Sequence, residues 1–152
     1  MQVENLRDIL HWTKEFHQHL ADCMKNCASQ QLNERAKMLL DYLSEHEYKL
    51  SSLLEAFEAS ADQNALNTWV YEYLDKSPIK GHEKCDKPFA EMTTEEIIGE
   101  IEDQHQQVIG LYRYLIGRAE IPSAIELLEQ LASLEEHEAM QMTHGANRLE
   151  DL

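Results

Sequence analysis

Glycine, proline and cysteine are scarce in this chain of 152 residues, with five, three and three copies. Few turn-forming residues and no alternating apolar and polar segment argue against a β-sheet. The cysteines Cys23, Cys27 and Cys85 are odd in number and form no Cys-x-x-Cys pair. This argues against a disulfide framework and against a rubredoxin-type or zinc-ribbon metal site. We therefore expect a helical protein with reduced thiols.

Other absences concern location and partners. No apolar run approaches the roughly 18 residues of a membrane span, and the N-terminus lacks the basic and apolar regions of a signal peptide. We therefore expect a soluble, cytoplasmic protein with no membrane partner. Lys and Arg number 13 against 29 Asp and Glu, and the formal net charge is −16. A strongly negative protein repels phosphate backbones, which argues against a nucleic-acid partner.

Apolar residues recur at the three-and-four spacing of amphipathic helices over four long segments. We expect helices at about residues 3–28, 31–59, 94–118 and 123–148. Capping boxes, Thr93-x-x-Glu96 and Ser123-x-x-Glu126, predict where the last two helices begin. The pattern breaks over residues 60–92, where a short helix is expected to lay four side chains on the bundle: Leu66, Trp69, Val70 and Tyr73.

The connections between these helices predict the topology. The first two helices are joined by a short link, which makes them antiparallel neighbours, and the last two form a second hairpin. We therefore predict one all-α domain over residues 1–152, an up-down-down-up four-helix bundle with a long crossover. Aromatic residues of the crossover are candidates for a homodimer contact, namely Trp69, Tyr71 and Tyr73.

A Glu-His-Glu triplet occurs twice, at residues 45–47 and 136–138. A helix turns by about 100° per residue, so the direction of each side chain follows from its position. If Leu131 marks the centre of the apolar face, Glu138 lies within about 20° and Glu135 within about 40°, but His137 lies about 120° away. The repeat thus predicts a buried pair, Glu135-x-x-Glu138, and a peripheral His137.

The same projection places further polar groups within about 60° of the centres of the other apolar faces. The complete inward set is His17, His46, Glu47, His105, Glu135 and Glu138. Imidazole and carboxylate are ligands that iron, manganese and zinc accept, and an unpaired buried carboxylate is costly. We therefore predict a buried His/Glu centre with one or two ions of iron or manganese, for which zinc is a substitute.

Two stretches, LNERAKMLLDYLSEHEYKL and LLEQLASLEEHEAMQM, resemble the second and fourth helices of the ferritin-like superfamily, and within it the rubrerythrin-like proteins. That family has a glutamate on the first and third helices and Glu-x-x-His on the second and fourth. Here Leu43 stands three residues before His46, Leu134 stands three before His137, and the third helix carries Glu102-x-x-His105. The resemblance implies iron or manganese binding with oxygen, peroxide or iron-storage chemistry.

Three interpretations remain open at this point. The first is a metal-binding ferritin-like protein that acts as an oxidase, a peroxidase or a metal-handling protein. The second is a metal-free ferritin-like bundle that serves as an interaction or regulatory module, which the broken Glu-x-x-His motifs favour. The third and weakest is a haem or oxygen carrier that uses the histidines as hemerythrin-like proteins do. The sequence leaves open whether the protein is an enzyme.

Overall fold

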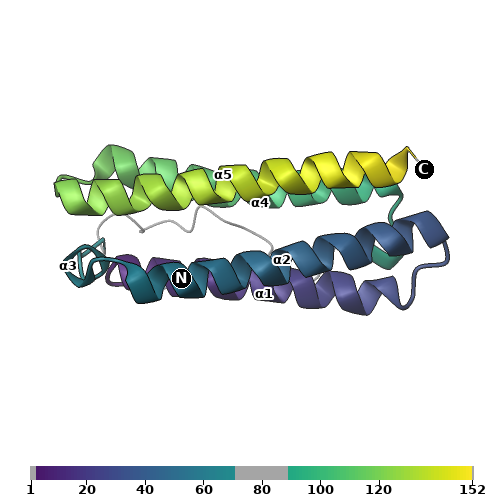
Figure 1. The fold of residues 1–152 in the computed structure, drawn as a ribbon, viewed down its shortest axis with the longest axis horizontal. Coiled ribbons are helices and arrows are strands. Elements are labelled where there is room, and N and C mark those ends of the chain that lie inside the picture. The colour runs from purple at the N-terminus through teal and green to yellow at the C-terminus, as the bar shows by residue number, and fades with distance from the viewer. Residues whose placement is uncertain (1–2, 71–88, 152) are drawn as a thin grey trace.

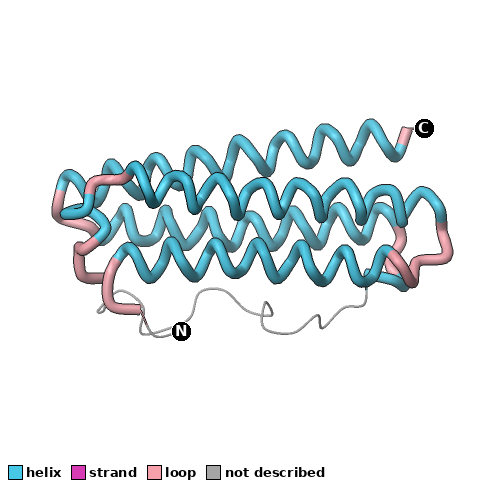
Figure 2. The backbone as a smooth tube through the Cα atoms, turned by 60° about the horizontal axis from the view of Figure 1, so that its bottom comes forward, coloured by secondary structure: helices cyan, strands magenta, loops and turns pink. Residues whose placement is uncertain are grey.

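The structure is a computed structural model that describes residues 3–70 and 89–151. Its elements in chain order are α1 (Leu6–Ala28), α2 (Glu34–Ser60), α3 (Gln63–Leu66), the 3-10 turn η2 (Phe89–Glu91), α4 (Thr94–Arg118) and α5 (Pro122–Glu150). The four long helices lie along one axis, with α1 and α5 running in one direction and α2 and α4 in the other (Figures 1 and 2). The predicted all-α class is confirmed.

The first two long helices begin where an asparagine caps them. The Asn5 side chain accepts a hydrogen bond from the backbone N–H of Asp8, and the Asn33 side chain accepts one from Ala36. Each bond satisfies an amide that has no partner within the helix. Helices α1 and α2 therefore start at Leu6 and Glu34, three residues later than the apolar pattern predicts.

Capping boxes are predicted at the starts of α4 and α5. The first is confirmed, because the Thr93 hydroxyl accepts from the Glu96 backbone while the Glu96 side chain accepts from the Thr93 backbone. The second is wrong. Helix α5 has Ile121 at its N-cap position with no side-chain bond, and it begins at Pro122. Proline has its φ angle fixed for the first helical position, so Ser123 already lies inside the helix.

The segment after α3 packs against the residues that precede α1. Backbone N–H groups of Leu6 and Val70 donate to the carbonyls of Thr68 and Glu4, both at 3.1 Å. Val70 is buried, as predicted, but Trp69 is 69% exposed. The alternation of an extended segment turns Trp69 outward. The predicted short helix therefore ends at Leu66, and the other aromatic residues of the crossover, Tyr71 and Tyr73, lie outside the described residues.

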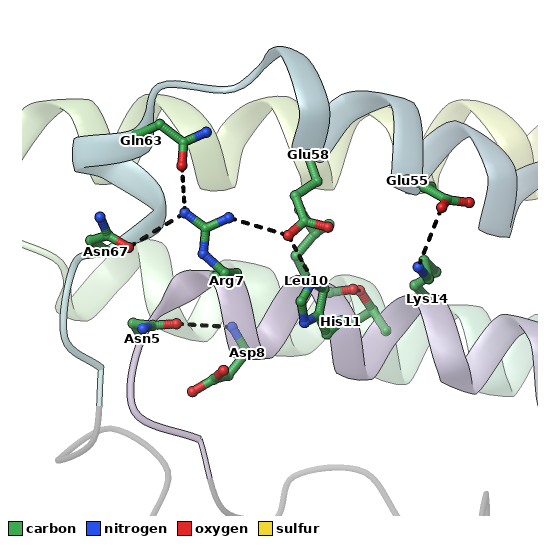
Figure 3. A network of polar contacts seen from close by, with 11 residues as sticks. Asn5, Arg7, Asp8, Leu10, His11, Lys14, Glu55, Glu58, Gln63 and Asn67 are labelled. Carbon is green, nitrogen blue, oxygen red and sulfur yellow. Dashed lines mark hydrogen bonds and ion pairs between the residues drawn. The ribbon is translucent and has the colours of Figure 1, made fainter.

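A surface network holds the start of α1 against the end of α2 and against α3 (Figure 3). Arg7 donates to Glu58 at 3.3 Å and to Gln63 at 2.6 Å, and His11 contacts the same Glu58 oxygen at 2.6 Å. Exposed ion pairs of this kind stabilise a protein by about 0–1 kcal/mol each. The network therefore aligns the helix ends, while burial of the apolar faces supplies the main stabilisation.

The long helices bury their apolar faces in one continuous core and direct most of their charged residues outward. Among the described residues, no helix is long and apolar enough to cross a membrane. The expected cytoplasmic location stays a prediction.

The cysteines differ in part from the expectation of reduced thiols. Cys27 is free, but Cys23 is disulfide-bonded. The expectation is therefore wrong for Cys23. Disulfide formation requires two Cα atoms to approach within about 7 Å, and the tertiary fold, not the spacing along the chain, determines that approach.

Candidate metal centre

Each of the four long helices contributes one buried ionisable side chain to a single cluster in the interior of the bundle. These side chains are His17 from α1, Glu47 from α2, His105 from α4 and Glu135 from α5. None is more than 1% exposed. Each lies on the inward face of its helix, where the helical repeat predicts it.

Direct contacts join these four side chains into a chain across the bundle. The Glu47 carboxylate lies between two imidazoles, since its Oε2 is 2.6 Å from His17 Nδ1 and its Oε1 contacts His105 Nε2. The other ring nitrogen of His17, Nε2, is 2.7 Å from Glu135 Oε1. The order of contacts is therefore His105, Glu47, His17 and Glu135.

Two serines of α2 position Glu47 opposite His17. The Ser44 hydroxyl donates to the Ala21 carbonyl of α1 at 2.8 Å, and the Ser51 hydroxyl donates to the Lys14 carbonyl at 3.3 Å. These bonds lie about one turn on either side of the contact between Glu47 and His17. They determine how far α2 is shifted along α1, and with it the position of the carboxylate.

When no metal ion is bound, protonation of His17 stabilises the cluster. A neutral imidazole has only one N–H, but both ring nitrogens of His17 lie within hydrogen-bond distance of carboxylates. His17 is therefore an imidazolium that donates to Glu135 and Glu47. Burial alone lowers the pKa of His17, but the charges of these two carboxylates outweigh it and raise the pKa to about 10.

The same balance acts on the central carboxylate. Burial alone raises the pKa of Glu47, but the charges and hydrogen bonds of His105 and His17 outweigh it and lower the pKa to about 2. Glu47 is therefore a carboxylate across the whole range of ordinary working pH. An ionised carboxylate is the form that a metal ion requires.

Three of the four residues fit a single metal ion. One ligand atom each from His17, Glu47 and His105 lies within 4.8 Å of the other two. Ligands that lie about 2.0–2.2 Å from an ion stand at most about 4.4 Å apart, so small side-chain movements complete the site. Two histidines and one carboxylate leave coordination positions open, which is typical of non-haem iron(II) and catalytic zinc sites.

Glu135 supports His17 as a metal ligand by accepting a hydrogen bond from its second ring nitrogen. When His17 binds an ion through Nδ1, its Nε2–H still donates to Glu135. A carboxylate that accepts from the second nitrogen of a ligand imidazole fixes the orientation of the ring and raises its basicity. The Glu135 Oε2 atom is buried and has no hydrogen-bond partner in the part of the chain that the structure describes. A buried carboxylate oxygen without a partner is costly, and a cation nearby reduces that cost.

The structure leaves two of the predicted ligands apart from this cluster. His46 is only half-buried, and its ring packs on the Tyr42 ring at 4.6 Å between centroids. Glu138 is buried as predicted, but its Oε2 lies 4.0 Å from Lys49 Nζ. Both His46 Nδ1 and Glu138 Oε2 are buried without a hydrogen-bond partner among the described residues. His137 is exposed, as the helix repeat predicts.

A second polar pair lies beside the centre; the helical repeat predicts that its Tyr112 points inward, but it does not predict the pairing with Thr13. The buried Tyr112 hydroxyl donates to the Thr13 hydroxyl at 2.9 Å. Burial, and after it the negative charge of Glu135, raises the pKa of Tyr112 well above its ordinary value. The spacing within each helix indicates that both residues face inward, since Thr13 lies about one turn before His17 and Tyr112 lies about two turns after His105.

Comparisons with known proteins assign no family to this chain. No family model, curated protein or solved structure matches it. The function inferred below is therefore based on the geometry of the buried cluster and on the sequence.

Proposed function

We propose that this protein binds one iron or manganese ion in a buried mononuclear centre, with His17, Glu47 and His105 as ligands and zinc as a substitute. One observation carries the proposal. Three potential ligand atoms from three different helices lie within 4.8 Å of one another, on side chains that are at most 1% exposed. Side chains that project inward from facing helices are how helix bundles build metal sites.

The charge balance of the interior supports this proposal. Glu47, Glu135 and Glu138 are all buried, and each ionised carboxylate in an apolar core is costly without a compensating charge. In the part of the chain that the structure describes, the cations paired with these carboxylates are His17 and Lys49, and Lys49 Nζ is 4.0 Å from Glu138 Oε2. A divalent ion supplies the positive charge that the cluster otherwise takes from a proton on His17.

We also propose a ferritin-like fold for the chain. The helix directions and the crossover between α3 and α4 support it, as do the two sequence stretches that resemble the rubrerythrin-like proteins. A bound iron or manganese ion would supply redox chemistry toward oxygen or peroxide, and the resemblance favours this class of reaction. We favour one ion over two because His46 and Glu138 make none of the contacts that join the cluster.

A metal-free interaction module is the second candidate, and one specific observation favours it. His17 already uses both ring nitrogens in contacts with carboxylates, so a single proton compensates much of the buried charge. In that case the cluster is a structural ion-pair network. The two candidates differ in whether a metal displaces this proton.

Cobalt(II) titration of chelator-treated protein tests the proposal, because cobalt(II) held by imidazole and carboxylate ligands in a site with few ligands absorbs visible light more strongly than cobalt(II) in water. We expect about one equivalent to bind and His105→Ala to abolish the absorption. His137→Ala is the matched control, since His137 is an exposed histidine on α5. Far-UV circular dichroism checks that the variants are folded. The proposal fails if wild-type protein binds no cobalt, or if His105→Ala binds it as tightly as wild type.

A further inference from the structure

A pocket of about 500 Å³ lies between α4 and α5 and reaches the centre of the bundle. Its floor and walls are mainly apolar and include Leu43 of α2, Ile98, Ile101 and Ile109 of α4, and Met142 of α5. Ligand pockets in proteins have volumes of roughly 300–1,000 Å³ and predominantly apolar walls. This pocket therefore has the size and lining of a site for a small organic molecule, and it is too small to hold a helix, which is about 10 Å across.

His105 connects this pocket to the proposed metal centre. The imidazole lines the pocket, and its Nε2 contacts Glu47. Among the described residues of the lining, His105 is also the one polar residue that is buried. A molecule in the pocket therefore has a single buried polar group to approach, and this group belongs to the cluster.

The charges at the rim restrict the kind of molecule that fits. Glu102, Asp103 and Glu136 line the pocket, and Arg113 is the only Arg or Lys of the lining within residues 3–70 and 89–151. Arg113 forms an ion pair with Glu136, so its charge is already compensated. The remaining rim is acidic and repels organic anions.

We propose that this pocket binds a mainly apolar small molecule that carries no negative charge, such as an aromatic alcohol or ketone, with its polar end toward His105. That the molecule is the substrate of the metal centre rests on the function proposed above. Binding itself does not, because side chains of α2, α4 and α5 form the pocket walls without any contribution from an ion. The site is thus open to a test in chelator-treated protein.

The test is a fluorescence titration of the chelator-treated full chain with N-phenyl-1-naphthylamine, a neutral apolar dye. Ala139 is half-buried and lines the pocket, so Ala139→Trp fills the space. We expect saturable binding at one site, and a loss of affinity of at least about tenfold in Ala139→Trp, because packed side chains leave no room for the dye. Ala56→Trp, on the exposed face of α2, is the matched control and should bind the dye as wild type does.

A second variant keeps the test decisive if Ala139→Trp does not fold. Ile98 is half-buried in the pocket wall, and Ile98→Gln makes that wall polar without adding bulk. It should weaken dye binding by about tenfold. Equal affinity of the dye for wild type and for every folded pocket variant would overturn the proposal. So would sedimentation that shows a dimer which Ala139→Trp dissociates, because the pocket would then be an interface between two copies.

The two proposals can fail separately. Dye binding without cobalt binding would support the pocket and contradict the metal centre. Cobalt binding without dye binding would overturn the pocket and leave the metal centre in place. If both bind, the dye should change the visible absorption of bound cobalt, since His105 is shared. An unchanged spectrum would contradict the proposed orientation toward His105.

Discussion

Glu47→Gln is the substitution that tests the buried cluster most sharply. The glutamine has nearly the shape of the glutamate but carries no charge, and Glu47 contacts both His17 and His105. Because the Glu47 pKa is lowered, its stabilising effect is present above the ordinary pKa of 4.5 and is therefore complete at pH 7. We expect the variant to fold, with a lower free energy of unfolding at neutral pH.

The expected decrease in the free energy of unfolding follows from the pKa of Glu47. A decrease from 4.5 to about 2 corresponds to roughly 3 kcal/mol, at about 1.36 kcal/mol per pKa unit. Removing one partner of a buried ion pair costs about 3–5 kcal/mol, which agrees with this figure. The raised pKa of His17 is not added, because it records the same contact with Glu47.

Urea unfolding with a chelator at pH 7 measures this loss. Glu45→Gln is the matched control, because Glu45 is exposed on the same helix and should change the free energy of unfolding by less than about 0.5 kcal/mol. Without chelator, a metal ion at a free concentration of about 100 times its dissociation constant should raise the free energy of unfolding of wild type by about 2.7 kcal/mol. Glu47→Gln should lack this increase. A Glu47→Gln variant as stable as wild type with chelator, and equally stabilised by metal, would refute the account of the cluster.

Further predictions concern pH, hydrogen bonds and assembly. In metal-free protein, the stabilisation from His17 is complete below pH 6.5 and is lost as the pH rises toward about 10, so melting temperatures with chelator should fall in that range. Metal affinity measured by cobalt titration should instead strengthen from pH 6 to about 8, because the ion must displace the proton on His17. Tyr112→Phe should lower the free energy of unfolding by about 1 kcal/mol in urea, since one buried hydrogen bond is lost. Thr93→Ala should cost about 1 kcal/mol in the same assay through loss of the α4 cap. Sedimentation at high micromolar concentration should give a homodimer that Trp69→Ala weakens, and a wild-type monomer would contradict that contact.

The helical periodicity predicts most of the fold because each long helix buries one apolar face. It places the starts of α1 and α2 only three residues early, since apolar residues continue beyond the asparagine caps. The motif Ser123-x-x-Glu126 matches a capping box in sequence but is not the helix start, because Pro122 already fixes the first turn. Local patterns thus predict helices well and their ends less well.

The burial of single residues on α5 is also predictable, since the repeat of about 100° per residue separates Glu135 and Glu138 from His137. The same repeat could not separate His46 from Glu47, because both lie near the edge of one apolar face. Packing of His46 against Tyr42 decides between them, and this contact depends on the tertiary structure. The contacts between carboxylates and imidazoles depend on how far one helix is shifted along another. The spacing of residues within each helix does not predict that shift.

Metal content is the measurement that tests the central claim most directly. Protein expressed with iron and manganese available, purified without chelator and analysed for metals should contain about one ion of iron or manganese per chain. His17→Ala and His105→Ala should lose the ion with little change in helix content, and His137→Ala should retain it. A wild-type protein without a bound metal, or equal metal content in His105→Ala and His137→Ala, would contradict the proposed centre.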